Sequence, residues 1–154
     1  MAKNKKPAKR YKPQPRMLPK NIRFSSDAEL KLQLIPHQNL ASLRSGSFEE
    51  HMWHAMAARM NLGNTLAYTY FEDAKDAMDK GCLALRSVWD RHSRTGKWGA
   101  TGEELCHLGD GLNYTDDMQL KCTRRELDSA MEHVYVVAAV DKRLPDSFIS
   151  SGQP

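Results

Sequence analysis

One short stretch, residues 49–54, carries side chains of the types that bind metal ions. It contains Glu49, Glu50, His51 and His54. On a helix the two histidines lie about one turn apart, as do Glu50 and His54, so two or three of these groups could reach one ion. The spacing matches neither H-E-x-x-H nor the E-x-x-H of di-iron bundles, and no second helix supplies a matching pair. We therefore interpret the stretch as the solvated first turn of a helix, where acidic residues are favoured, and predict no metal ion and no cofactor.

Three cysteines are the candidates for a nucleophile, and one of them, Cys106, is followed by His107. Neighbouring residues on a helix point about 100° apart, so these two cannot form a thiolate pair through sequence neighbourhood alone. Three is an odd number, and Cys82, Cys106 and Cys122 include no C-x-x-C pair, which argues against a disulfide framework and a zinc finger. We interpret them as reduced, packed thiols of a cytosolic protein.

The sequence lacks the common motifs of hydrolytic and nucleotide-binding enzymes. It contains no G-x-S-x-G, no Walker A sequence and no G-x-G-x-x-G. The glycines around Trp98 are spaced G-x-x-G-x-x-G and follow a helical pattern rather than a strand. We therefore predict that the protein is not an enzyme.

The strongest functional signal is the separation of charge along the chain. The first 23 residues hold nine basic residues and no acidic one, whereas the other 131 hold 14 basic against 19 acidic residues, a net charge of −5. Such a basic segment can bind a polyanion by releasing counterions, and Tyr11 could stack on an unpaired base. The predicted contact residues for nucleic acid or another acidic partner are Lys3, Lys5, Lys6, Lys9, Arg10, Tyr11, Lys12, Arg16, Lys20 and Arg23.

The same segment, residues 1–23, also contains four prolines. Proline removes an amide donor and biases its predecessor toward an extended conformation, so no long helix is expected there. High charge and few apolar side chains predict a segment that is disordered or polyproline-like until something binds it. Two alternatives remain open: the segment is a solubilising tail, or it folds back on the acidic remainder of the chain.

The elements that must position these residues are helices, and the longest helical pattern runs from Ser47 to Thr95. It contains no proline, and a capping box of Ser47 with Glu50 predicts its start. As one rod it would measure roughly 70 Å, so we expect a break at Asn61–Asn64 or at Thr69–Asp73. A break at either place folds the stretch into an antiparallel hairpin.

Two short helices are expected before this hairpin. Residues 28–35 follow a capping box at Ser26, although their alternating leucines would also suit a strand. Pro36 suits the first turn of a further helix, residues 37–44, which Gly46 would end.

Two more helices are expected after the hairpin. Capping boxes of Thr101 with Glu104 and of Thr123 with Glu126 predict helices over residues 101–122 and 123–142. The apolar side chains of the second, Leu127, Met131, Val134 and Ala138, are expected to face inward. Residues 134–140 could instead form a strand, but the chain offers no convincing partner strand.

A glycine-rich loop, residues 93–102, carries Trp98, which needs a partner surface and which we suspect at an interface. Of the other tryptophans, Trp89 is expected in the core, and Trp53 could lie at the edge of the apolar face. The remaining candidates for an interface are carboxylates expected to be exposed: Glu49, Glu103 and Asp117.

Together these patterns predict an all-α bundle of four to six helices in a single domain. Its expected parts are a flexible basic arm (1–23), a helical domain (24–144) centred on the 47–95 hairpin, and a flexible tail (145–154). The composition, 40% hydrophobic and 27% charged, is that of a soluble protein. No apolar run approaches a membrane span and the N-terminus lacks a signal peptide, so we predict a cytoplasmic protein.

Three segments of the sequence resemble parts of known proteins: KRYKPQP, LRSGSFEEHMWHAMAARMNLGNTLA and RHSRTGKW. They are similar to small accessory proteins carried by bacteriophages and prophages of proteobacteria, over about residues 9 to 135. None of these motifs is catalytic. The resemblance implies context only, namely an accessory phage gene acting inside a bacterial host cell.

These observations lead to three functional hypotheses. In the first, a non-enzymatic phage-type binding protein uses its basic arm to reach nucleic acid or a nucleic-acid-handling host complex. In the second, a protein-protein inhibitor or adaptor blocks a host defence or transcription complex, with the acidic body as its DNA-mimicking or docking surface. The third is a metal-dependent enzyme built on Glu50, His51 and His54. A homodimer through the 47–95 hairpin is a further candidate partner.

Overall fold

Five α-helices and no strand make up residues 26–141, the part of the chain that the computed structural model describes; side chains are described for residues 33–137. The helices are α1 (Ser26–Ser45), α2 (Glu50–Tyr70), α3 (Lys75–Thr95), α4 (Gly102–Lys121) and α5 (Arg124–Asp141), with a short 3-10 helix, η1 (Glu72–Ala74), between α2 and α3. The predicted all-α fold is confirmed. The predicted basic arm (1–23) and the predicted tail (145–154) lie outside the described residues.

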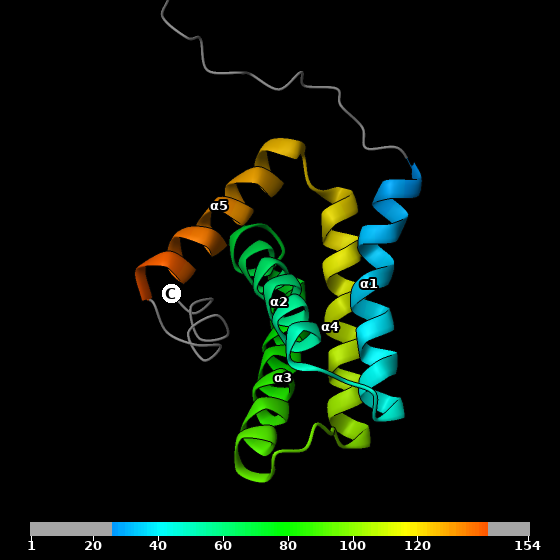
Figure 1. The fold of residues 1–154 in the computed structure, drawn as a ribbon. Helices are drawn as coiled ribbons and strands as arrows, with labels where there is room; N and C mark the ends of the chain where they lie inside the picture. The colour runs from blue at the N-terminus through cyan, green and yellow to red at the C-terminus, as the bar shows by residue number, and fades with distance from the viewer. Residues whose placement is uncertain (1–25, 142–154) are drawn as a thin grey trace, which may run out of the picture.

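The α2–α3 hairpin is the centre of the bundle (Figure 1). α4 packs against both of its helices, α1 packs beside α4 and against α2, and α5 packs on α2. No helix in residues 26–141 is long and apolar enough to cross a membrane.

The break in the long helical stretch lies at Phe71, within the second of the two predicted places. Phe71 leaves the helical conformation at φ −132° and ψ 79°, and η1 follows it. The other predicted place, Asn61–Asn64, is wrong, because α2 continues through it and all four residues are buried. Packing of this turn against α3 and α4 outweighs the roughly 1 kcal/mol that Gly63 costs inside a helix.

The first helix differs from the prediction of two short ones. α1 runs without interruption from Ser26 to Ser45 and contains Pro36, so the predicted boundary at this proline and the alternative of a strand over residues 28–35 are both wrong. Proline removes a single backbone hydrogen bond, and α1 packs against α4 and α2. Gly46 ends the helix as predicted, in the left-handed conformation at φ +83°. The side chain of Ser26 is outside the described set.

Ser47 closes the end of α1 instead of opening α2. Its amide donates to the carbonyl oxygen of Ser42 at 3.0 Å, and its Oγ lies 2.9 Å from Oγ of Ser45. The predicted capping box of Ser47 with Glu50 is therefore wrong. The N-cap of α2 is Glu49, whose side chain makes no capping hydrogen bond.

The two later capping boxes are confirmed. The Thr101 hydroxyl accepts from the amide of Glu104, and the Glu104 carboxylate accepts from the amide of Thr101. Thr123 and Glu126 make the same reciprocal pair, so α4 and α5 begin where predicted, and residues 134–140 are helical. The loop between α3 and α4 is shorter than the predicted 93–102, because α3 continues to Thr95.

α5 buries less than its sequence predicted. Among the α5 side chains described, up to residue 137, Ala130 is the buried apolar one, Leu127 and Val134 are half-buried, and Met131 is 39% exposed instead of facing inward. α5 packs mainly on α2, so much of its apolar surface has no covering helix among the described elements. The side chain of Ala138 is not described.

Three glycines allow α2, α3 and α4 to approach one another closely. A Cβ atom added at Gly63 would overlap Oγ1 of Thr115 and lie 2.7 Å from Cε of Met78. One added at Gly81 would lie 3.1 Å from the carbonyl oxygen of His107, and one at Gly111 would lie 3.2 Å from Sδ of Met60. The close packing of the helices therefore explains why these three residues are glycine.

We predict opposite effects for alanine at two helical glycines. Gly63→Ala should lower the free energy of unfolding by about 1–3 kcal/mol, because its methyl group has no space beside the buried Thr115. Gly109→Ala should raise it by about 0.5–1 kcal/mol, since its Cβ would meet only Cδ2 of Leu40, at an ordinary 3.7 Å. Urea unfolding followed by circular dichroism measures both. Equal effects of the two substitutions would show that the close approach at Gly63 is not needed.

Candidate functional site

The residues of metal-binding type at the start of α2 form two separate pairs. Nδ1 of His51 lies 3.2 Å from a carboxylate oxygen of Glu49, and Nε2 of His54 lies 3.5 Å from one of Glu50. All four side chains are between 48% and 71% exposed. Residues 26–141 contain no group of three or more His, Cys, Asp or Glu side chains that could hold a metal ion.

The three cysteines have different environments. Cys82 is buried, and its burial together with nearby Asp79 raises the pKa of the thiol to about 12, so it is protonated at neutral pH. Burial, and to a smaller extent Glu126, also raises the pKa of the half-buried Cys122. Cys106 is exposed, so the prediction that all three thiols are packed is wrong for this residue.

Trp98 finds its partner surface within the chain. Its ring stacks on His92 with centroids 3.7 Å apart and an angle of 5° between the planes, and it makes a T-shaped contact with Phe48, with centroids 5.3 Å apart. Trp89 lies 5.9 Å from it and is half-buried. An interface with another molecule at Trp98 stays a prediction. Only the part of the Trp98 side chain that is still exposed could take part in it.

Trp53 is the most deeply buried tryptophan, so its predicted place at the edge of the apolar face is wrong. It is 1% exposed, and its Nε1–H donates to the carbonyl oxygen of Leu85 at 3.1 Å. This bond satisfies the indole inside the hairpin, which is why the ring can be fully covered.

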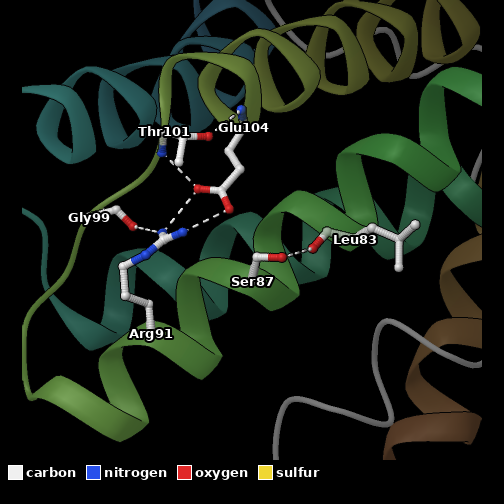
Figure 2. Close-up of polar contacts among 6 residues, drawn as sticks. All are labelled: Leu83, Ser87, Arg91, Gly99, Thr101 and Glu104. Atoms are coloured by element: carbon white, nitrogen blue, oxygen red, sulfur yellow. Dashed lines mark hydrogen bonds and ion pairs between the residues drawn. The ribbon is translucent and has the colours of Figure 1, made fainter.

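Arg91 fixes the loop that carries Trp98 (Figure 2). Its guanidinium donates to both carboxylate oxygens of Glu104, at 2.9 and 3.0 Å, and to the carbonyl oxygen of Gly99 at 2.6 Å. The Glu104 carboxylate also accepts from the amide of Thr101. One carboxylate thus caps α4 and ties the loop to α3.

The charge on Glu104 is stabilised by these contacts. Partial burial alone would raise the pKa of its carboxyl, but the hydrogen bonds from Arg91 and Thr101 outweigh it and the pKa is lowered. The hydrogen bond to Glu104 in turn raises the pKa of Arg91. The pair is therefore ionised throughout the neutral range.

The outer surface of α4 carries a row of carboxylates, which we call the α4 acidic row: Glu103, Asp110 and Asp117. All three are exposed and lie seven residues apart, on one face of the helix. None has an ion-pair partner among the side chains described. Glu49, the remaining carboxylate predicted at an interface, is also exposed but lies beside His51.

Asp116, next to this row, differs from it because its carboxylate is paired with other side chains. Its carboxylate accepts from Arg59 of α2 and lies 2.8 Å from Nε2 of His37 in α1, so it joins three helices. The partners are 57 and 79 residues away from Asp116 in sequence, so no local sequence pattern predicts these contacts.

The predicted contact residues of the basic arm, residues 1–23, lie outside the described residues. No protein-family model matches the chain, and no curated protein or solved structure matches it. The resemblance to phage accessory proteins therefore stays a prediction, and function must be inferred from the residues of the chain itself.

We predict that Glu104→Gln lowers the free energy of unfolding at pH 7 by about 1–2 kcal/mol, because it removes the charge from a partly exposed, doubly hydrogen-bonded pair. The pKa of this group is lower in the folded than in the unfolded state, so its contribution is complete above the ordinary value of 4.5 and is lost as the pH falls through the folded-state pKa. The difference between wild type and variant should therefore shrink in acid.

Urea unfolding at pH 7, 5 and 3 measures this difference. Glu132→Gln is the matched control, because Glu132 is exposed and has no partner among the described residues; it should change stability by less than about 0.5 kcal/mol at every pH. If the cost of Glu104→Gln were the same at pH 7 and pH 3, the ionised pair would not be its cause.

Proposed function

We propose that this is a non-enzymatic, phage-type accessory protein that binds nucleic acid, or a host complex that handles nucleic acid, through its basic N-terminal segment. The observation that carries the proposal is the separation of charge: nine basic and no acidic residues in positions 1–23, and a net charge of −5 over the rest. Phosphate contacts from lysine and arginine supply most of the affinity of sequence-independent binding.

The negative charge of the helical domain supports binding through the basic segment. A polyanion is repelled by the α4 acidic row, whereas the basic segment is the part of the sequence with the highest density of positive charge. That segment ends at Arg23, three residues before α1 begins, and α1 is held to the bundle through the contact of His37 with Asp116. The basic segment is therefore joined to the helical domain at the start of α1.

Deleting residues 1–23 should abolish binding to DNA and RNA and leave the helical circular dichroism unchanged. For the intact protein, log K should fall by about 0.9 for each phosphate contact per tenfold increase in salt on duplex DNA. About six contacts would weaken binding by roughly 10³-fold between 50 and 200 mM salt. Fluorescence anisotropy with labelled duplex and single strands measures both effects.

Tyr11→Ala is the control within the segment, because it keeps all nine positive charges. It should weaken binding to single strands and leave duplex binding nearly unchanged, since only unpaired bases offer a free face for stacking. If the intact protein showed no salt-sensitive binding to either nucleic acid, the segment would be a solubilising tail and the proposal would fail.

A second candidate function is favoured by the α4 acidic row. At 1.5 Å per residue, its three carboxylates are spaced by roughly 10 Å along the helix. They are exposed and unpaired among the described residues, so they are free to meet a basic surface. In this alternative the protein is an inhibitor or adaptor that docks on a basic surface of a host defence or transcription complex, in place of its nucleic acid.

The two functions can be separated by neutralising the row. In the alternative, the triple variant Glu103→Gln, Asp110→Asn and Asp117→Asn should lose at least tenfold in affinity for a captured host complex, measured by nuclease-treated pull-down. The matched control removes three carboxylates that are exposed and unpaired on other elements, by Asp73→Asn, Asp90→Asn and Glu132→Gln. Equal loss in both variants would indicate a net-charge effect and contradict docking through α4.

A further inference from the structure

The turn between α4 and α5 holds the densest group of basic side chains in the described part of the chain. Residues 121–125 include Lys121, Arg124 and Arg125 and no acidic residue. Lys121 and Arg125 are exposed, and neither side chain makes an ion pair or a hydrogen bond with a described residue. Arg124 is half-buried, and its Nε lies 3.5 Å from a carboxylate oxygen of Asp128. Two cations of this turn are therefore free to meet a ligand.

The carboxylates that follow the turn are already paired within α5. The Glu126 carboxylate accepts from the amide and the hydroxyl of Thr123, at 2.8 and 2.9 Å. Asp128 lies one turn further on and is the partner of Arg124. The unpaired charges at the turn are therefore both positive, which suits an anionic partner.

The position of Arg125 is unfavourable for a basic side chain in the helix itself. Arg125 is the second residue of α5 and lies in its first turn, where the helix dipole favours acidic residues and opposes basic ones. No ion pair or hydrogen bond of its side chain offsets this effect among the described residues. A residue that breaks a local stability rule without compensation is expected where it serves binding.

α1 brings the basic segment to the same end of the bundle as this turn. Two contacts show that α1 runs antiparallel to α4: His37 lies 2.8 Å from Asp116, and Cδ2 of Leu40 lies 3.7 Å from the position of a Cβ atom at Gly109. Earlier residues of α1 are therefore beside later residues of α4. The start of α1 lies at the end of α4 where the chain turns into α5 (Figure 1).

The length of chain between the basic segment and the bundle keeps the two close together. Arg23 precedes Ser26, the start of α1, by three residues, which span at most roughly 11 Å. From the contact of His37 with Asp116, α1 extends roughly 16 Å back to Ser26 and α4 roughly 8 Å on to Lys121. With about 10 Å between the two helix axes, a phosphate bound at Arg23 is within roughly 25 Å of Lys121. About seven base pairs of duplex DNA cover that distance.

We propose that Lys121 and Arg125 contact the phosphate backbone of the nucleic acid that the basic segment binds. This contact rests on the proposed function and extends the binding surface onto the folded domain. Once the segment has bound a polyanion, contact with the turn is intramolecular and occurs at a high effective concentration. Two contacts are too few to bind nucleic acid without the segment. The α4 acidic row limits the surface, because Asp117 lies one turn before Lys121 and repels phosphate.

The test compares the full chain with the double variant Lys121→Gln and Arg125→Gln, by fluorescence anisotropy with a labelled duplex. Loss of two phosphate contacts should weaken binding at least tenfold at about 100 mM salt and reduce the slope of log K against log salt by about two. Urea unfolding should show that the variant is at least as stable as the wild type, because both side chains are exposed and unpaired.

The matched control removes two cations near the opposite end of α4, by Arg94→Gln and Lys97→Gln. Both side chains are exposed and make no ion pair among the described residues. They precede the start of α4 at Gly102, which is roughly 30 Å along the helix from Lys121. This variant has the same net charge as the first, and it should bind within about threefold of the wild type with an unchanged salt slope.

Equal losses in the two double variants would overturn the contact at the α4–α5 turn and leave the proposed function standing, because the domain would then act only through its net charge. A weaker affinity of the Lys121 and Arg125 variant with an unchanged salt slope would also overturn it, since these side chains would not then neutralise phosphates. If the intact protein showed no salt-sensitive binding, both the contact and the proposed function would fail.

Discussion

The close approach of α2, α3 and α4 is the constraint on which the rest of the bundle depends. It exists because Gly63, Gly81 and Gly111 present bare backbone to Met60, Met78 and Thr115 at the places where the helices are nearest. The tight contact sets where α4 lies against the hairpin. α4 in turn provides the surface for α1 and the starting point of α5. A larger side chain at one of these glycines would therefore move surfaces that lie far from it.

Helix boundaries were predictable where their signals are local. The boxes at Thr101 and Thr123 involve only a residue and its neighbour three positions on, so four letters of sequence suffice. Ser47 offers the same letters, yet its amide and hydroxyl serve the end of α1, because the chain turns there at Gly46. The break expected at Asn61–Asn64 failed for a different reason. The sequence shows only that Gly63 is unfavourable inside a helix. Burial of this turn against α3 and α4 outweighs that local preference.

The candidate binding surfaces likewise include some that the sequence predicts and some that it does not. The basic segment is visible in composition alone, and Glu103 and Asp117 could be suspected as exposed carboxylates before any fold was known. The contacts of Asp116 with Arg59 and His37 join residues that are distant in sequence, and Arg91 reaches Glu104 across a loop. The hollow between α2 and α5, about 540 Å³ in volume, is not predicted by any local pattern, because residues of α1, α2, α4 and α5 line it together.

The arrangement of the tryptophans has an optical consequence. Trp53 and Trp89 have ring centroids 4.8 Å apart, and Trp89 and Trp98 5.9 Å apart, so all three indoles of the chain belong to one cluster where α2, α3 and the α3–α4 loop meet. Indoles at such separations exchange excitation energy, and their emission reports on the cluster as a whole. Intrinsic fluorescence will therefore follow the opening of this one corner of the bundle, and no indole lies on α1, α4 or α5 to report on the detachment of those helices.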